Sequence, residues 1–539
     1  MLIGIDLGTT YCAVAALDAQ GHARMLPNRD GEILTPSAVY LAPDGSAVVG
    51  QAALDIALEQ PERVATLIKR RMGYPDYGRP VAGRDFRPET LCAIILKKLV
   101  QDAELSGERI DGCVITVPAY FDDTRRKATM DAGRIAGLPV LDILDEPTAA
   151  ALAYAHQHGW TQPAGASDLF QGLGTSRTVL VYDLGGGTFD VTLVKLARQR
   201  FQVLAIEGDV RLGGRDWDER LANWAAEQFR DTFGTDPRDD PQSHAQLLAT
   251  AERVKRTLSK IEQTTLTISH AGQRLVLPVS RHELEHLTRD LLLRTRLTTQ
   301  QLLRQVQLSW DQVDQVLLVG GSTHMPAVAR MLTELTGRQP ERSLAVSEVV
   351  ARGAALHAGI VVAQRRAPAL DPLASGSASL LATPPVPDEE SFPRLDWADV
   401  VEISVNAHSL GIEVRNGTER IHHKLVPKNT QLPAAGEHIY YTVRDNQTRV
   451  RIRVLQGEAH QAEACIPVGE CWIEDLPPGL PKGAPVRVRC GVAPNGCIEV
   501  AAVDLTSGRA VTAHLYRPGG LTDEQIAREA DFLRRLHVL

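Results

Sequence analysis

The sequence has few cysteines, and it lacks both a long apolar segment and a recognisable export signal. The seven cysteines are an odd number, spread thinly over 539 residues, which does not favour a secreted protein stapled by disulfides. No apolar run approaches the roughly 20 residues that a membrane-spanning helix needs. Residues 1–6 carry no basic segment and already include a carboxylate, Asp6. We therefore expect a cytoplasmic protein with free thiols and no membrane partner.

An excess of positive charge is missing as well. The formal net charge is -8 at pH 7, with 58 Lys and Arg against 66 Asp and Glu. This balance argues against a general affinity for nucleic-acid phosphates, so no nucleic-acid partner is expected. Hydrophobic residues make up 44% and charged residues 23% of the chain, which is typical of globular proteins. The length predicts two or three domains.

Four of the cysteines, Cys465, Cys471, Cys490 and Cys497, lie near the C-terminus. Their spacings do not resemble the close pairs of zinc knuckles, and each lies in or beside an apolar run typical of a strand. We expect small buried side chains here, and a metal site is the less favoured alternative.

Sequence patterns divide the chain into four parts. Residues 1–361 alternate β-branched runs with helix-period segments, which predicts an α/β domain. Residues 362–399 are rich in Pro, Ala and Ser and are typical of a linker. Residues 400–516 predict an all-β domain, and residues 517–539 predict one short helix with Thr522 as its N-cap.

The clearest strands and helices of the α/β part can be placed individually. Strands are expected over residues 1–5, 112–117, 178–182 and 316–319. Helices are expected over residues 125–136, 216–233 and 244–263.

Two segments of the α/β part repeat one pattern, in which a strand is followed by an aspartate, a glycine turn and a second strand. Residues 6–10 read Asp-Leu-Gly-Thr-Thr, and residues 183–188 read Asp-Leu-Gly-Gly-Gly-Thr. The repetition predicts a duplicated fold whose halves face one ligand. A third turn, Gly-Gly-Ser-Thr at residues 320–323, follows another expected strand.

Glycine turns of this kind suit the binding of phosphate groups. Without a Cβ, backbone N–H groups can approach phosphate oxygens closely, and threonine hydroxyls add donors. A carboxylate at the end of each strand lies where Mg²⁺ and its waters would neutralise the phosphates. One such turn is usually only a turn, but three together favour a nucleotide site.

The three loops resemble the phosphate and adenosine segments of the actin-like ATPases. Residues 117–121 (Val-Pro-Ala-Tyr-Phe) and 145–151 (Asp-Glu-Pro-Thr-Ala-Ala-Ala) narrow the resemblance to the seventy-kilodalton heat-shock chaperones, the Hsp70 or DnaK family. The similarity covers roughly residues 1–360 and 400–530. Within the family, the short length resembles the bacterial HscC-type paralogues more than full-length DnaK.

The resemblance implies an α/β fold with a two-lobed actin-like (ribonuclease H-like) ATPase domain, then an all-β sandwich that binds peptides and a short C-terminal helix. It also implies an ATP-dependent chaperone with ATP/ADP and Mg²⁺ as cofactors and unfolded or extended polypeptides as clients. J-domain co-chaperones and nucleotide exchange factors are the partners that the family implies.

Roles around the nucleotide are carried over where residues match the family. The resemblance assigns catalysis to Lys69, Glu146, Asp183 and Thr188. It assigns nucleotide contacts to Asp6, Gly8, Thr9, Thr10, Tyr11, Gly185, Gly186, Gly187, Asp190, Glu252, Lys255, Arg256, Ser259, Gly320, Gly321, Ser322 and His324. Asp6 and Asp183 would also hold Mg²⁺, largely through water. Lys69 would position the attacking water and stabilise charge on the transferred phosphoryl group, whereas an isolated lysine would indicate only a solvated surface charge.

Two features of these residues affect their predicted roles. Glu252, Lys255, Arg256 and Ser259 are spaced so that they share one helix face, although an exposed helix with salt bridges would show the same spacing. His324 stands where the family has an arginine, so adenine stacking would depend on an imidazole.

The β region carries its own match to the peptide-binding sandwich, in the runs Ser-Leu-Gly-Ile-Glu at 409–413 and Val-Leu-Gln-Gly-Glu at 454–458. The resemblance places the peptide slot at Ile412, Arg415, Tyr440, Val443, Gln447, Val450 and Ile452. Such recognition combines main-chain hydrogen bonds with an apolar pocket. The alternative for each apolar residue is plain sandwich core. Arg415 replaces an apolar residue that arches over the peptide and would favour acidic flanks.

Coupling between the domains resembles that of the family but with changes. The resemblance assigns it to Pro118, Arg126, Val400, Val401 and Ile403. Glu402 interrupts the apolar linker, and Ser404 stands where an aspartate is usual. Asp142 occupies the position of an arginine that meets J-domain co-chaperones, which puts J-protein stimulation in doubt or implies a specialised partner.

One short motif points elsewhere. His282-Glu283-Leu284-Glu285-His286 matches the H-E-x-x-H pattern of zinc proteases, but no third ligand follows at the usual spacing. We expect an ordinary helix of the second lobe here.

Two further functions stay open at this stage. A weakly hydrolysing scaffold or exchange factor of the same fold would retain the nucleotide site but lose its coupling. A small-molecule kinase on the same core would not need the β-sandwich, which argues against it.

The sequence predicts fast peptide exchange in both nucleotide states, because only one short helix follows the β region and no lid would close over the slot. Release of a fluorescent peptide should therefore proceed at similar rates with ATP and with ADP. Strong slowing of release by ADP would contradict this prediction.

Overall fold

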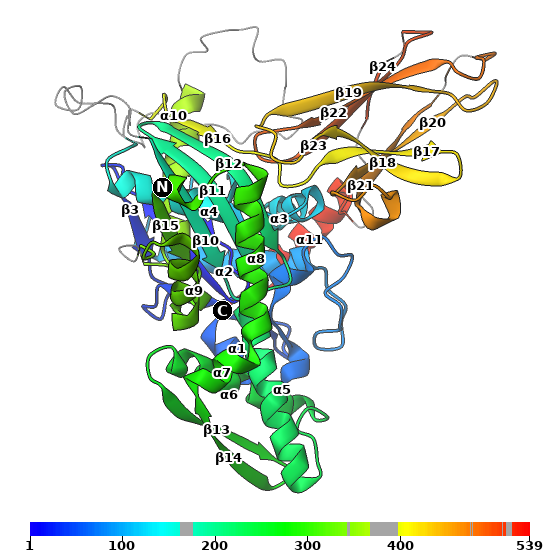
Figure 1. Ribbon diagram of the computed structural model, residues 1–539. Helices are drawn as coiled ribbons and strands as arrows, with labels where there is room; N and C mark the ends of the chain where they lie inside the picture. Colours follow the sequence, from blue (N-terminus) through cyan, green and yellow to red (C-terminus); the bar gives the residue numbers. More distant parts are fainter. Residues whose placement is uncertain are drawn as a thin grey trace, which may run out of the picture.

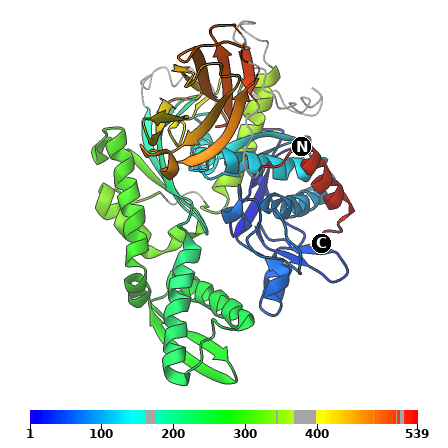
Figure 2. The same ribbon diagram turned by 90° about the vertical axis from the view of Figure 1, so that its right-hand side faces the viewer.

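The computed structural model describes residues 1–161, 176–341, 345–366, 397–474, 476, 478–508, 510–513 and 520–539. Most of the predicted linker, 362–399, lies outside these residues. The α/β part and the all-β part that the sequence predicts are both present, and Figures 1 and 2 show the sandwich lying against one end of the α/β part. No helix of the described residues is both long and apolar enough to cross a membrane.

The α/β part contains two sheets with similar strand order and strand directions. The first has the order β3 (Ala23–Leu26), β2 (Tyr11–Leu17), β1 (Leu2–Asp6), β8 (Gly112–Val117) and β9 (Val140–Asp145), and the second has the order β16 (Val401–Ile403), β12 (Arg200–Asp209), β11 (Phe189–Ala197), β10 (Arg177–Leu184) and β15 (Gln315–Val319). In each sheet an antiparallel hairpin, β1–β2 or β10–β11, is followed by a parallel neighbour, β8 or β15. The predicted duplication is therefore confirmed.

Two alanine-rich helices lie between the sheets. Helix α4 (Glu146–Gln157) contacts β10 and β11, whereas α10 (Val349–Arg366) contacts β1, β2 and β8, and the two helices contact each other. A Cβ on Gly353 would lie 1.8 Å from the Ala149 carbonyl oxygen, and one on Gly4 would lie 2.1 Å from the Ala355 nitrogen. The helices can approach each other and the sheet this closely only because these positions have no side chain.

Smaller elements extend each half. The first half adds β4 (Leu34–Pro36), β5 (Val39–Leu41), β6 (Ala47–Val49), α1 (Gln51–Ala57), β7 (Val64–Ala65), α2 (Pro88–Ala103) and α3 (Asp123–Ile135). The second adds α5 (Gly214–Phe233), α6 (Pro241–Leu258), β13 (Gln263–His270), β14 (Gln273–Ser280), α7 (Arg281–Leu287), α8 (Arg289–Gln305) and α9 (Pro326–Thr336).

One of the expected helices is shorter than predicted. The periodicity predicted a helix to residue 263, but α6 ends at Leu258 and Ser259 is its C-cap. The next residues enter the hairpin β13–β14, whose first strand reads Gln-Thr-Thr-Leu-Thr-Ile-Ser-His. Threonine and isoleucine favour strands because their β-branched side chains fit a pleated sheet, and this preference ends the helix early.

The β part is a sandwich of two four-stranded antiparallel sheets. One has the order β18 (Glu419–Val426), β17 (Leu410–Asn416), β20 (Val450–Gln456) and β21 (Ile466–Ile473), and the other has the order β19 (Ala434–Tyr441), β22 (Pro485–Val492), β23 (Ile498–Asp504) and β24 (Ala510–Ala513). Cys471 and Cys490 are buried in its core and Cys465 is buried beside it, as predicted. All seven cysteines lie in described parts of the chain, and none forms a disulfide.

The C-terminal helix packs on the first half of the α/β part. Helix α11 (Asp523–Arg535) begins at Thr522, whose hydroxyl accepts a hydrogen bond from the Gln525 N–H, which confirms the predicted N-cap. It contacts α2 and α3, at the right in Figure 2. Residues 537–539 then pair with the edge at Ala47 through backbone hydrogen bonds of 2.8 and 2.9 Å.

Replacing Leu533 of α11 by alanine should destabilise the α/β part by about 2–4 kcal/mol, because it removes buried apolar volume and leaves a cavity. Leu533 is 2% exposed, in one core cluster with Ile526, Leu536 and Val538. Urea titration would measure the free energy of unfolding. Leu105→Ala, at a 65% exposed position, is the control and should change that free energy by less than about 0.5 kcal/mol.

Candidate functional site

Two glycine loops, one from each sheet, meet face to face. A Cβ on Gly186 would lie 2.3 Å from the Thr10 hydroxyl oxygen, and one on Gly187 would lie 2.3 Å from the Thr9 methyl carbon. The loops after β1 and β10 can touch only because these positions are glycine. The structure therefore brings the two predicted phosphate segments together.

The third loop joins them from the end of β15. Gly320 has a φ of 82°, and a Cβ there would lie 2.6 Å from the Asp183 Oδ1 atom. Ser322 donates a hydrogen bond of 2.9 Å from its hydroxyl to the Gly185 carbonyl oxygen. Gly321 is exposed to solvent, and a Cβ on it would meet no atom within 4 Å. The three loops thus form one continuous surface of backbone and hydroxyl groups.

Other loop residues support this arrangement. A Cβ on Gly8 would lie 2.0 Å from the Tyr11 carbonyl oxygen, so the first turn also requires glycine. The Gly185 N–H donates to the Thr188 carbonyl oxygen over 3.0 Å, which closes the second turn. Thr9 and Thr188 are buried.

A buried ion pair spans the first half beside these loops. Lys69, on a short 3-10 helix at Ile68–Arg71, donates a hydrogen bond to Glu146 Oε1. Glu146 is the first residue of α4. The Lys69 side chain is 3% exposed and its nitrogen lies 6.0 Å from the centre of the Phe121 ring. Lys69 is therefore a desolvated cation held in position, and the alternative of a solvated surface charge is wrong.

Three aspartates lie in the same region, and their surroundings raise the pKa of each carboxyl group. Burial, reinforced by repulsion from Glu146, raises the pKa of Asp6 to about 7 and that of Asp190 to about 8. The same causes raise the pKa of Asp183 well above its ordinary value. Burial alone would lower the pKa of Lys69, but attraction to Glu146 and Asp6 raises it. One lysine cannot balance this much buried negative charge.

The carboxylates are not arranged as a direct metal cage. Among the described residues, no three Asp, Glu, His or Cys side chains lie close enough to hold one ion. Oxygen donors are nevertheless the type that Mg²⁺ takes, and Mg²⁺ usually keeps several of its waters. The residues therefore fit a Mg²⁺ ion bound largely through water.

The predicted face of α6 lies across from the first loop. Arg256 stacks over the Tyr11 ring at 5.1 Å and pairs with Glu252 at 3.1 Å. Ser259 donates from its hydroxyl to the Lys255 carbonyl oxygen at 3.1 Å. The contact between Tyr11 and Arg256 joins the two halves of the α/β part, which an isolated exposed helix would not do.

Lys255 has a different role from its neighbours on α6. Its ammonium group is buried and contacts Asp218 at 2.8 Å and the Gly214 carbonyl oxygen at 2.8 Å. Sequence reasoning missed Asp218, because only the start of α5 against α6 brings the two residues together. It likewise missed Arg70, which donates to the Gly187 carbonyl oxygen at 3.0 Å and pairs with Asp216 at 2.5 Å.

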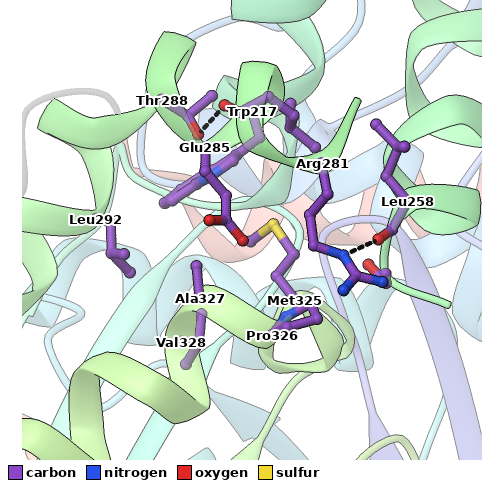
Figure 3. A pocket seen from close by; sticks show the side chains of 12 residues that line it. Trp217, Leu258, Arg281, Glu285, Thr288, Leu292, Met325, Pro326, Ala327 and Val328 are labelled. Atoms are coloured by element: carbon purple, nitrogen blue, oxygen red, sulfur yellow. Dashed lines mark hydrogen bonds between the residues drawn. The ribbon is translucent and has the colours of Figure 1, made fainter. Parts of the chain in front are cut away.

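Behind the third loop lies a mostly apolar pocket, drawn in Figure 3. Trp217, Leu258 and Met325 are among the side chains that line it, together with Ser259 at the end of α6. Arg281 donates to the Leu258 carbonyl oxygen at 2.7 Å, and Thr288 donates to the Leu284 carbonyl oxygen at 2.7 Å, as Figure 3 shows. His324 is exposed just before Met325, and its stacking on adenine stays a prediction.

The H-E-x-x-H segment forms helix α7, as predicted. His282 and His286 are not buried, whereas Leu284 is. Glu285 pairs with Arg330 at 2.6 Å. The segment thus packs as an amphipathic helix at the edge of the pocket.

The predicted slot residues separate into two groups. Ile412 and Ile452 are buried in the sandwich core, and Tyr440 and Val450 are partly buried against it. The other group lies on or beside loops. Arg415 and Val443 are exposed, and Gln447 accepts a hydrogen bond from the Val443 N–H at 3.0 Å.

Comparison with known proteins agrees with this architecture. A family model of the Hsp70 protein matches residues 2–81, 77–371 and 392–533. The chaperone protein DnaK of Thermotoga neapolitana is 37% identical over 544 residues, which cover 99% of this chain and 83% of that protein. DnaK of Thermotoga petrophila and of Thermotoga maritima match with the same identity and coverage.

The chain belongs to the Hsp70 family. Its fold is accordingly the actin-like ATPase domain followed by a β-sandwich and a C-terminal helix. The protein is an ATP-dependent chaperone that binds nucleotide and acts on unfolded polypeptides. Because Hsp70 proteins hydrolyse ATP, a weakly hydrolysing scaffold is not favoured, and the predicted similarity to HscC-type paralogues stays a prediction.

One of the predicted coupling residues of this Hsp70 chain lies where the sandwich meets the ATPase domain. Arg126 pairs with Asp145 at 2.6 Å and reaches the Asn495 carbonyl oxygen of the sandwich at 3.5 Å. Arg126 thus lies at the contact between the domains. Pro118 accepts a hydrogen bond of 3.0 Å from the Phe121 N–H within the ATPase domain, and its role in coupling stays a prediction.

The linker residues pair with the second sheet. Strand β16 runs parallel to β12, and the Val401 N–H donates to the Gln199 carbonyl oxygen at 2.8 Å. Val400 and Ile403 are buried, but the Val401 side chain is 43% exposed.

Sequence reasoning missed most of the contact between sandwich and ATPase domain. Lys428 pairs with Glu207 at 2.6 Å, and both side chains are buried. His408 lies 3.1 Å from the Tyr120 carbonyl oxygen, and Asp123 accepts from the Ile498 N–H at 2.9 Å. No local pattern marks these residues, because the contact joins positions about 200 to 375 apart in the chain.

Without divalent cation or nucleotide, the protein should lose stability as pH rises from 5 to 8. Asp6 holds its proton to a pKa of about 7 when folded, whereas an unfolded aspartate releases it near pH 4. Between these values the folded state binds more protons, so raising pH favours unfolding by about 1.4 kcal/mol per pH unit for each such group.

Urea titrations in EDTA would measure this slope. Asp6→Asn should reduce it, because asparagine cannot ionise, while the exposed Asp30→Asn should leave it unchanged. A slope that is equal in wild type and Asp6→Asn would show that Asp6 is ionised throughout this range.

Proposed function

We propose that this Hsp70 chain hydrolyses ATP at the meeting point of its three glycine loops, with Lys69, Glu146, Asp183 and Thr188 as the catalytic residues. The buried Lys69–Glu146 pair beside those loops carries the proposal. Lys69 would position the attacking water and stabilise the charge that develops on the transferred phosphoryl group. Glu146 would orient Lys69 and the water network from the start of α4.

We also propose that Asp6 and Asp183 hold Mg²⁺, largely through water. Their raised pKa values indicate a site with more negative charge than its own lysine neutralises. When bound, Mg²⁺ would supply the missing positive charge and neutralise the phosphate oxygens. The carboxylates' part is then to fix the waters around the ion, while the backbone N–H groups of the glycine loops bind the phosphates.

The nucleoside would lie between Tyr11 of the first loop and the α6 face. Arg256 and Glu252 are paired there, and Ser259 adjoins the apolar pocket. Lys255 would act indirectly, because its ammonium group already contacts Asp218 and the Gly214 carbonyl oxygen. His324 would cover the base from the third loop.

We infer four functional parts with the boundaries 1–361, 362–399, 400–516 and 517–539: ATPase domain, linker, peptide-binding sandwich and C-terminal helix. An extended client would bind by main-chain hydrogen bonds beside Tyr440 and Val450. Both side chains are partly buried against the sandwich core. Arg415, which is exposed, would arch over the client, and the exposed Val443 would add to the slot.

We also propose partners and a location by analogy with the family. A nucleotide exchange factor and a J-domain protein are proposed partners, and the J-domain protein would be atypical because Asp142 replaces the usual arginine. We further propose a cytoplasmic location, in line with the odd number of thinly spread cysteines in the sequence.

Replacing Lys69 by alanine should lower the single-turnover rate of ATP hydrolysis by about 100-fold or more, because the transition state loses a desolvated cation. Nucleotide affinity should change much less. Lys260→Ala, an exposed lysine just past the end of α6, is the matched control and should hydrolyse at the wild-type rate. A Lys69→Ala protein with unchanged single-turnover kinetics would overturn the proposed catalytic role.

A further inference from the structure

Three ionisable side chains meet where the linker strand docks, away from the nucleotide loops. His357 of α10 lies between Asp142 of β9, at 3.2 Å from Nε2, and Glu402 of β16, at 2.7 Å from Nδ1. The imidazole is largely buried, and so is the Glu402 carboxylate. One ring therefore connects the first sheet, the central helix and the linker.

The surroundings favour a charged imidazole. Burial alone would lower the pKa of His357, but Glu402 and Asp142 together raise it to about 10. A neutral ring has only one N–H donor, whereas the protonated ring carries positive charge that can pair with both carboxylates. Nε2 is within hydrogen-bond distance of Asp142, and the Nδ1 contact with Glu402 is an ion pair. His357 is thus a cation between two anions at neutral pH.

Other charges near this helix are directed elsewhere. Strands β2 and β8 contain no charged side chain, and β1 contains only Asp6, at its nucleotide end. On α10 itself, Arg365 donates to the Leu141 carbonyl oxygen at 3.1 Å, and Arg352 pairs with Glu348 at 2.8 Å.

Among the described residues, no cation of α4, β3 or β12 pairs with Glu402 or Asp142. Helix α4 carries Glu146 and His156, of which His156 contacts the Thr161 hydroxyl. Strand β3 carries Arg24, which lies 3.7 Å from Glu108, and β12 carries an exposed Arg200 at its start. Within the described residues, the Glu402 carboxylate has no other ion-pair partner than His357.

Apolar packing and one hydrogen bond also hold the linker. Trp397, Val400 and Val405 are buried in a core cluster of the ATPase domain, and the Gln364 side chain donates to the Val400 carbonyl oxygen at 2.8 Å. Strand β16 is only three residues long and pairs with β12 at three positions. Within residues 400–403, Val400 and Ile403 bury apolar surface, whereas Val401 is 43% exposed. The Glu402 carboxylate is largely buried and would oppose docking of this strand unless a cation met it.

We propose that Glu402, His357 and Asp142 form an ionic latch that fixes the linker strand β16 to the ATPase domain, so that docking of this strand depends on one buried cation as well as on the apolar residues beside it. The latch makes the docked linker sensitive to any change that moves α10 against β9, because both carboxylates share the same ring. It operates on the linker itself and does not depend on hydrolysis.

The latch predicts a specific response to loss of the imidazole. His357→Gln leaves the largely buried Glu402 carboxylate and the partly exposed Asp142 carboxylate without their cation, and the least costly escape is release of the short linker strand into water. The Val401 amide, which donates to Gln199 in the docked state, should then exchange its hydrogen at least 10-fold faster.

Hydrogen–deuterium exchange of the full chain at pH 7, without nucleotide, would test the latch through peptides that span residues 398–404. The triple variant Asp142→Asn/His357→Gln/Glu402→Gln replaces the three charges by amides and should restore most of the protection. Glu402→Gln alone should also speed exchange of the linker. His282→Gln, on helix α7 far from the linker, is the control and should leave linker exchange unchanged.

Exchange in peptides from β1 and β8 reports whether each variant is folded. If His357→Gln speeds exchange in those peptides too, linker exchange in Glu402→Gln decides the test, because that variant removes only the linker charge. Wild-type exchange of the Val401 amide in the folded single variants would overturn the latch. Because no nucleotide is present, that outcome would leave the proposed ATPase function untouched.

Discussion

The close contact of α4 with α10 is the constraint on which the arrangement of the site depends. Gly353 lies directly against the Ala149 carbonyl, and Gly4 of β1 lies against the backbone of α10. These contacts bring the two sheets to a fixed separation, with their strand ends facing each other. Glu146 begins α4, so the same contact also places the carboxylate that holds Lys69. A bulkier residue at position 353 would move both the loops and the ion pair.

The nucleotide site concentrates negative charge that its own residues do not neutralise. Asp183 and Asp190 are buried and Asp6 is half-buried near Glu146, and Lys69 is the cation that faces them. Keeping such charges apart from water costs free energy unless a ligand compensates it. The site is therefore organised to gain stability from a bound cation and polyphosphate, which is a physical reason for lobe closure to respond to nucleotide.

The contact between the sandwich and the ATPase domain is strongly polar. It includes the Lys428–Glu207 pair, the Asp123 contact to Ile498 and the reach of Arg126 toward Asn495. Contacts of this type resemble transient interfaces more than a shared core. The linker contact between Glu402 and His357 is also an ion pair. These charge pairs accompany apolar contacts, because Trp397, Val400, Val405 and Ala407 are buried in a core cluster of the ATPase domain.

Local patterns in the sequence were enough for the strand–turn–strand repeat, the three glycine turns, the Glu252–Arg256 face of α6 and the Thr522 cap, because each depends on residues a few positions apart. The end of α6 was misjudged because the following strand competed with the helical period. The Lys255–Asp218 contact, the docking of α11, the sandwich interface and the His357 cluster were decided only by tertiary structure. Each joins residues that are distant in the chain, and no spacing rule relates a β9 aspartate, an α10 histidine and a linker glutamate until packing brings them together.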